Sequence, residues 1–141
     1  EVFPMDGLDL FANVNVAAIL EDGEGGNLRD ASTSLVKANL GGSYRSPFRT
    51  DVSLAMHFVS GQTWRLRNFD AAGQIVETPS DIPSRFLLSA RVASRPFANE
   101  DLEVSWVIFN ALGLAESMKF REHPSGQLIG PRMFGSISYR F

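Results

Sequence analysis

The sequence predicts an all-β, antiparallel fold of about six long strands that cross a membrane as one segment, residues 1–141, of a larger β-barrel. Three observations support this prediction. Apolar and polar residues alternate with a period of two, the connections between strands alternate between long and short, and aromatic residues gather near the strand ends. A period of two places every second side chain on the same face of a strand.

The six expected strands span residues 7–19, 34–45, 50–60, 83–93, 101–110 and 132–141. Their apolar sets take every second residue, in chain order, from Leu8 to Val16, Val36 to Tyr44, Val52 to Phe58, Phe86 to Val92, Leu102 to Ile108 and Gly135 to Phe141. Each strand has about ten residues, whereas soluble strands average about five or six and a tilted bilayer-spanning strand needs about nine to eleven. Strand length therefore favours a membrane-spanning sheet.

The connections between these strands hold about 14, 4, 22, 7 and 21 residues in turn. Outer-membrane barrels combine long extracellular loops with tight periplasmic turns in the same rhythm. Aromatic residues are expected at both ends: Tyr44, Phe48, Phe97, Tyr139 and Phe141 at the short-turn side, and Phe58, Trp64 and Phe86 toward the long loops. Such rings are typical of the two lipid–water boundaries.

Charged residues of the strands fall on the face opposite the apolar set. They include Lys37, Asp51, Arg85, Arg91, Glu103 and Arg140. An arginine or lysine that faces lipid at mid-bilayer costs about 2–4 kcal/mol, so we expect the apolar set to face lipid and the charged set to face the lumen. Six strands are too few to close such a barrel, and open edges in hydrocarbon leave backbone groups unpaired. We therefore expect the chain to be part of a longer protein.

Composition argues against several other classes of function. The formal net charge of −3, with 13 scattered lysines and arginines, gives no basic face for nucleic acid. The absence of cysteine removes disulfides and thiolate metal sites. No apolar run approaches the roughly 18 residues of a transmembrane helix. A Gly-x-Ser-x-Gly elbow and a coherent Ser/His/Asp arrangement are also missing, so we do not expect an enzyme.

The sequence predicts neither a metal site nor a cofactor. His57 and His123 have no ligand-like spacing. Four acidic residues stand among glycines in the first long connection: Glu21, Asp22, Glu24 and Asp30. Calcium takes such carboxylates, but the spacing of an EF-hand is missing, so a solvated loop is the simpler interpretation.

The connection 61–83 and the lumen face hold the candidate ligand-binding residues. These are Trp64, Arg65, Arg67, Phe69, Arg85 and Arg91. Residues 64–69 alternate aromatic and cationic side chains, a pattern that can stack on and pair with an anionic or planar ligand. The interpretation that we favour for 64–69 is that they continue the barrel wall above the membrane, with Trp64 as an interface anchor.

The last ten residues, Arg132-Met-Phe-Gly-Ser-Ile-Ser-Tyr-Arg-Phe141, resemble the terminal strand of an outer-membrane protein, which ends on an aromatic residue with another two positions before it. The segments 102–110, 120–126 and 129–132 are similar to the close of TonB-dependent receptors, and 37–41 and 43–48 resemble strand–turn segments of that family. The resemblance extends from about Gly7 onward. The chain departs from the family's pattern in two places. The usual glycine of the terminal strand would fall at Ser136 but stands here at Gly135, and residues 111–113 also differ.

This resemblance implies a large outer-membrane barrel with an N-terminal plug domain that lies outside residues 1–141. Receptors of the family bind a scarce nutrient, such as a siderophore, cobalamin or oligosaccharide, and admit it when the TonB energy-coupling complex pulls on the plug. Tyr139 and Phe141 would form the signal read by the barrel-assembly machinery. Expected partners are thus outer-membrane lipid, the remaining strands and plug, the coupling complex and that machinery.

Two other interpretations stay open. A passive porin-like barrel would have the same strands without a plug. A soluble β-sandwich binding module would use the apolar set as the core between two sheets, because sandwiches show the same alternation.

Overall fold

The computed structural model describes residues 1–18, 20–21, 28–29, 31–98 and 101–141. Its strands are β1 (Val2–Met5), β2 (Leu8–Val16), β3 (Leu20–Glu21), β4 (Leu28–Arg29), β5 (Val36–Arg45), β6 (Thr50–Val59), β7 (Gln62–Phe69), β8 (Ile75–Ile82), β9 (Arg85–Ser94), β10 (Leu102–Phe109) and β11 (Arg132–Tyr139). Two short 3-10 helices, η1 (Ala111–Leu114) and η2 (Glu116–Met118), follow β10. In this described part no helix is long and apolar enough to cross a membrane.

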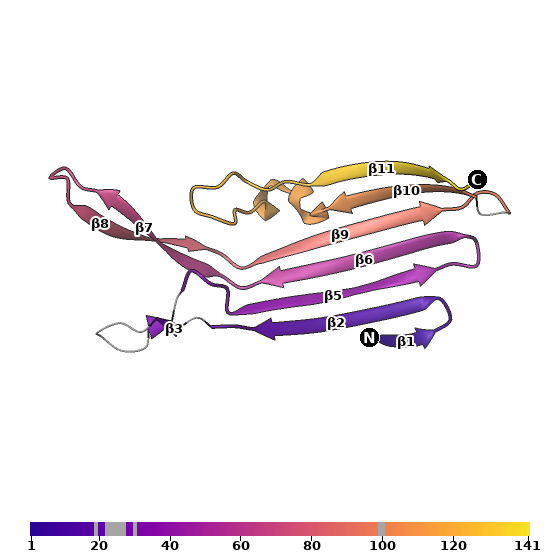
Figure 1. Ribbon diagram of the computed structural model, residues 1–141, viewed down its shortest axis with the longest axis horizontal. Coiled ribbons are helices and arrows are strands. Elements are labelled where there is room, and N and C mark those ends of the chain that lie inside the picture. Colours follow the sequence, from indigo (N-terminus) through magenta and orange to yellow (C-terminus); the bar gives the residue numbers. More distant parts are fainter. Residues whose placement is uncertain (19, 22–27, 30, 99–100) are drawn as a thin grey trace.

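Among the described residues, seven strands form one antiparallel sheet in the order β1-β2-β5-β6-β9-β10-β11. Each strand pairs with the next strand of the sheet along the chain, and the sheet is a single layer (Figure 1). The all-β, antiparallel prediction is confirmed. β1 was not predicted, because its pairing with β2 is irregular and only four residues long.

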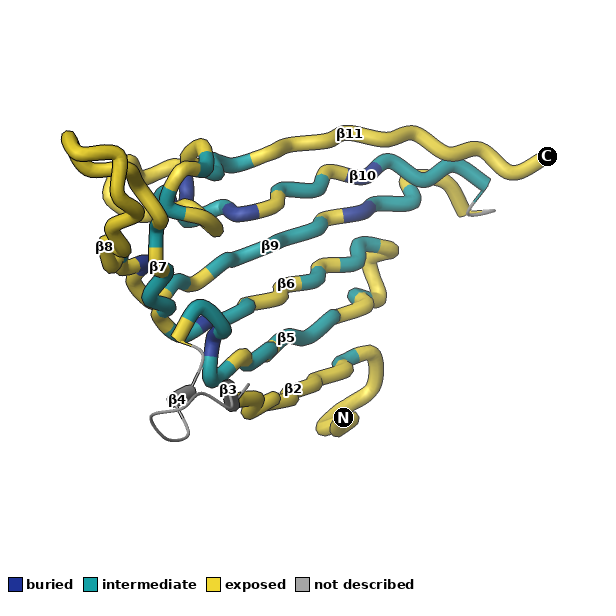
Figure 2. The backbone as a smooth tube through the Cα atoms, turned by 60° about the vertical axis from the view of Figure 1, so that its left-hand side comes forward, coloured by how far each residue is buried: buried dark blue, intermediate teal, exposed yellow. Residues whose placement is uncertain are grey.

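The connections sort by length to the two ends of the sheet (Figures 1 and 2). The short ones, 6–7, 46–49 and 95–101, join strands at the end where the chain also finishes. The long ones, 17–35, 60–84 and 110–131, join strands of the main sheet at the opposite end. We call these the short-turn end and the long-loop end.

The long connection 60–84 is itself a hairpin of β7 and β8. The pairing of Val59 with Arg85 in β6–β9 continues as Gln62 with Ile82 in β7–β8, without a change of register. The strands predicted to end at 60 and to begin at 83 therefore extend far beyond the sheet, and most of the predicted loop is strand.

The register joins the apolar sets of all strands into one face. One row across the sheet consists of Leu10, Gly42, Leu54, Ala90, Ile108 and Met133. The adjacent row on the other face consists of Asp9, Ser43, Ser53, Arg91, Val107 and Phe134. Because side chains alternate between faces, a pairing slip of one residue would mix the two sets. We call the two sides the apolar face and the polar face.

Most of the large side chains of the apolar face are exposed. They include Leu10, Val14, Val16, Leu40, Tyr44, Val52, Leu54, Met56, Phe86, Val92, Trp106, Met133, Ile137 and Tyr139. The buried apolar residues of the described chain are Val59, Ile82, Ala93 and Phe120, and none of them belongs to this face of the seven-stranded sheet. The sheet therefore has no core of its own on its apolar side.

Two aromatic rings lie over glycines of the neighbouring strand. On the polar face, Phe11 pairs with Gly41, and a methyl group on Gly41 would come 2.6 Å from the ring and 2.7 Å from the Leu54 carbonyl oxygen. On the apolar face, Trp106 pairs with Gly135, and a methyl group on Gly135 would come 3.2 Å from the nearest atom of the Trp106 ring. The missing side chain leaves room for the ring in each case.

Replacement of Gly41 by alanine should lower the free energy of unfolding by about 1–3 kcal/mol, because Phe11 and the backbone at Leu54 must both move. Denaturant unfolding of the refolded chain in detergent measures this change. Gly130→Ala is the matched control, since its nearest neighbour is a Lys119 carbon at 4.0 Å. Equal stability of the Gly41 variant and the wild type would contradict the ring-over-glycine packing.

Candidate functional site

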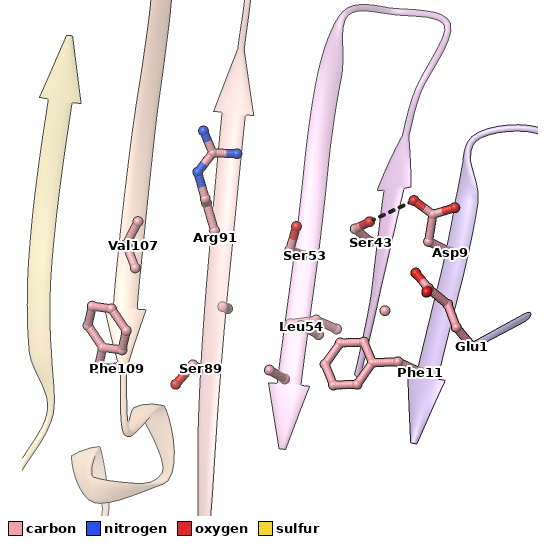
Figure 3. Close-up of a pocket in the computed structure, with 13 residues that line it drawn as sticks. Glu1, Asp9, Phe11, Ser43, Ser53, Leu54, Ser89, Arg91, Val107 and Phe109 are labelled. Atoms are coloured by element: carbon pink, nitrogen blue, oxygen red, sulfur yellow. Dashed lines mark hydrogen bonds between the residues drawn. The ribbon is translucent and has the colours of Figure 1, made fainter. Parts of the chain in front are cut away.

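A groove of about 510 Å³ lies on the polar face in the middle of the sheet (Figure 3). Phe11 of β2 and Phe109 of β10 stand on either side of it, and Glu1 reaches it from the N-terminus. Small side chains of the intervening strands form its floor: Ser43, Ser53, Ala55 and Ser89. The groove offers two aromatic walls and several hydroxyl groups, which suits a mostly apolar group with a few polar atoms.

Asp9 and Arg91 close the groove toward the short-turn end (Figure 3). The Ser43 hydroxyl donates to Asp9 Oδ2 at 3.5 Å, and the two residues pair across β2 and β5. Arg91 donates to Glu103 Oε1 at 2.6 Å. Both charged side chains are thus held in place by a neighbouring strand.

An ionic ladder crosses four strands next to this point and consists of Arg45, Asp51, Arg95, Glu103 and Arg91. Arg95 Nη2 lies 2.8 Å from Asp51 Oδ2 and 3.0 Å from Glu103 Oε2, and so bridges β6 and β10. Arg91 completes the pairing of Glu103, while Arg45 approaches Asp51 at 3.8 Å. The hydrogen bond to Asp51 is the main cause that raises the pKa of Arg95.

Two further hydrogen-bonded sets of uncharged polar groups lie on the same face, one nearer the long-loop end and one in the row of Asp51. Asn39 Nδ2 donates to Asn13 Oδ1 at 2.7 Å, and Asn39 Oδ1 hydrogen-bonds to His57 Nδ1. The hydroxyls of Ser105 and Ser136 lie 2.8 Å apart across β10 and β11. These hydrogen bonds join side chains that we expect to line the lumen, and His57 is one of them.

The predicted ligand residues of 64–69 all lie on β7, but they point to two sides of the hairpin. Arg65 and Arg67 share Glu77 of β8, at 4.0 and 3.1 Å. Phe69 is exposed near the tip and pairs with Ile75. Trp64 lies on the opposite side, where its ring meets the His123 ring at a centroid distance of 4.7 Å.

Arg85 lies at the base of the hairpin and contacts the last long connection. Its guanidinium carbon is 5.4 Å from the centre of the Phe120 ring. Its Nε and Nη1 groups are buried and find no hydrogen-bond partner in the described part of the chain, and the same holds for Trp64 Nε1. Arg85 and Trp64 thus anchor the connection 110–131 to the base of the hairpin.

The structure distributes the six predicted residues over three places. Arg65, Arg67 and Phe69 lie along one side of the hairpin, Trp64 and Arg85 contact the last connection, and Arg91 lies at the groove.

Sequence reasoning did not find Glu77, the partner of two of these arginines, nor the bridging role of Arg95. Both depend on cross-strand register. The sequence signal that could have indicated these ion pairs is that residues of opposite charge fall on the same face near the same strand end.

No group of three or more potential metal ligands occurs among the described residues. Of the acidic residues weighed for calcium, Asp22, Glu24 and Asp30 lie outside the described residues, and the side chain of Glu21 is not described. Comparisons of the chain with protein-family models, curated proteins and solved structures find no match.

Replacement of Glu103 by glutamine should lower the free energy of unfolding by about 1–3 kcal/mol, because two half-buried arginines lose their shared carboxylate. Denaturant unfolding in detergent measures the change. The matched control is Glu116→Gln, whose side chain is 79% exposed and pairs with Lys119 near the long-loop end, and it should cost about 0–1 kcal/mol. If both variants lose the same stability, the ladder is not a structural unit.

Proposed function

We propose that this chain forms part of the wall of a bacterial outer-membrane β-barrel, and that the barrel is a receptor of the TonB-dependent kind that takes up a scarce nutrient. The observation that carries the proposal is the apolar face, which extends over the seven strands with its large side chains exposed. Soluble monomers rarely expose a continuous apolar patch larger than a few hundred Å². Lipid is the solvent that suits this face.

The opposite face supports the same assignment. The charged residues of the long sheet strands, among them Asp9, Lys37, Asp51, Arg91 and Glu103, lie on the polar face. A charged side chain that faced lipid at mid-bilayer would lower the stability of the folded barrel. In the proposed orientation the polar face lines a lumen, and the ionic ladder and the groove belong to that lumen.

The order of the connections supports a transmembrane wall. Tight connections at one end and long ones at the other are the pattern of barrels with periplasmic turns and extracellular loops. In this orientation, the hairpin of β7 and β8 and the connection 110–131 extend into the extracellular space. They and the groove are then the parts that would meet a nutrient.

The two edge strands indicate what would complete the wall. β1 and β11 both run toward the short-turn end, and each has an open edge in the described sheet. An antiparallel neighbour for either edge must run toward the long-loop end. An antiparallel closure therefore adds an odd number of strands, which gives the even total typical of bacterial barrels.

The terminal residues fit the assembly signal that we infer. Tyr139 and Phe141 are exposed, and their ring centroids lie 5.1 Å apart. β11 is an edge strand, so its outer edge is free to pair during assembly. We propose that this end of the chain is read by the barrel-assembly machinery.

A soluble β-sandwich would need a second sheet on the apolar face. In the described part of the chain, β7–β8 is a separate two-stranded sheet that extends beyond the end of β6 and β9 (Figure 1). The exposure of the apolar face thus favours lipid over a second layer of this chain.

Cell fractionation tests the proposal. The chain, expressed in a bacterium together with its native upstream sequence, should be recovered in detergent-extracted outer membrane as a β-rich species whose electrophoretic mobility changes on heating. A monodisperse, folded protein that needs no detergent would overturn the membrane assignment. Uptake of candidate nutrients by cells, with and without the coupling complex, then separates a receptor from a passive porin.

A pair of adjacent substitutions tests which face meets lipid. Leu54→Arg places a charge on the apolar face and should reduce the folded fraction in lipid bilayers, since the cost is about 2–4 kcal/mol near the midplane. Ala55→Arg adds the same charge in the groove, where there is room, and should fold nearly as well as wild type. Heat-modifiability in lipid vesicles measures both, and an equal loss in the two variants would contradict the assignment of faces.

A further inference from the structure

A second hollow, of about 470 Å³, lies at the short-turn end of the polar face and is distinct from the central groove. Its lining consists of Arg45, Ser46, Pro47, Arg49, Arg95 and Arg140. Four arginines thus surround one space, and the described residues that line it include no acidic one. These arginines come from the end of β5, the turn 46–49 and the segments that follow β9 and β11.

The backbone holds Arg49 in this position at a conformational cost. Arg49 has a φ of 59°, in the left-handed region, which a residue with a side chain adopts only under constraint. Its N–H donates to the Ser46 carbonyl at 3.1 Å, and its carbonyl accepts from the Arg95 N–H at 3.0 Å. Glycine or asparagine would take this conformation more readily, yet an arginine stands here at the hollow.

The nearby carboxylates of Asp51 and Glu103 pair chiefly with one of these four arginines, Arg95. Asp51 and Glu103 direct oxygen atoms at Arg95, which leaves little of its charge for the hollow. Arg45 approaches Asp51 only at 3.8 Å, and its side chain is 77% exposed.

Arg49 and Arg140 are exposed and make no salt bridge within the described residues. Asp101 also lies beside Arg140, whose N–H donates to the Asp101 carbonyl at 2.9 Å. Even with Asp101 included, arginines outnumber carboxylates among the described residues around the hollow.

We infer that this hollow binds a multivalent oxyanion of the phosphate class, held chiefly by Arg45, Arg49 and Arg140. Guanidinium groups match the oxygens of phosphate in charge and in planar, two-pronged geometry. The hollow opens on the polar face, so the anion approaches from the side opposite the exposed apolar residues. Its volume lies within the range of about 300–1,000 Å³ that is typical of small-molecule sites. This inference goes beyond the proposed function and does not require the barrel.

Titration calorimetry with pyrophosphate tests the inference on the chain with its native upstream sequence, purified in a zwitterionic detergent, with chloride at matched ionic strength as the blank. Arg49→Asn removes a cation and relieves the left-handed conformation, so it should fold at least as well as wild type. It should weaken pyrophosphate binding by about tenfold, and addition of Arg140→Gln by about a further tenfold.

Arg132→Gln is the matched control, because it removes one positive charge from the same face of β11 at the long-loop end. It should change the affinity by less than about twofold, as expected for a screened, distant charge. The inference fails if the wild type shows no binding above the chloride blank, or if Arg132→Gln weakens binding as much as Arg49→Asn.

A competition arm identifies the source of the phosphate. Displacement of pyrophosphate by phosphatidate mixed into the micelles would assign the site to a lipid headgroup. Binding that phosphatidate leaves unchanged would assign it to a soluble phosphate compound, which is the outcome that we expect from the placement of the hollow on the polar face.

Discussion

The cross-strand register is the constraint on which the other features of this protein depend. Each of the five regular pairings between neighbouring strands of the main sheet keeps the apolar sets together, so one side of the sheet can meet an apolar solvent. A slip of one residue between β6 and β9 would carry Arg91 to the apolar face of β6 and separate Arg95 from Asp51. The same slip would break the contacts that build the groove. The exposure of one apolar face, the ion pairs and the shape of the groove therefore all depend on the strand register.

The two ends of the sheet differ in the side-chain contacts that they hold. Near the short-turn end the ionic ladder joins β5, β6, β9 and β10, and all its side chains except the exposed Arg45 are at least half-buried, which gives the sheet a cross-strand connection independent of the backbone ladder. At the long-loop end, aromatic rings also meet: Phe58 and Phe86 at a centroid distance of 4.9 Å on the apolar face, and Trp64 and His123 at 4.7 Å beside the last long connection. The middle, between these clusters, holds the small residues that leave space for the groove.

Much of the fold is accessible from the sequence because the side-chain period of a strand is read directly from residue order. The predicted strand 34–45 corresponds to β5, 50–60 to β6 and 101–110 to β10, within one or two residues at each end. β1 escapes such reasoning, since a four-residue strand with an irregular pairing has almost no period. The hairpin of β7 and β8 escapes for another reason. Its residues lack clean alternation, and it is held by the register of the strands below it.

The candidate sites were less accessible from the sequence. The partners of Arg91 and Arg95 lie on other strands, and their identity depends on which residues face each other across the sheet. The hollow at the short-turn end brings Arg49 and Arg140 together although they are far apart in the sequence. Parity alone assigns a residue to a face. Only the pairing assigns it to a neighbour.

The hairpin of β7 and β8 shows how the chain limits unwanted pairing outside the sheet. The Thr63 N–H donates away from β8, to the Ala31 carbonyl at 2.8 Å, so the N–H groups of alternate residues from Thr63 onward also point outward. Pro79, opposite Arg65, then occupies an outward position on β8, where it has no N–H to offer. The outer edge of β7 is flanked instead by the charged side chains of Arg65 and Arg67. One edge lacks a donor and the other carries charge, and both devices discourage the addition of a further strand. A two-stranded extension can in this way remain a hairpin although its strands are largely exposed.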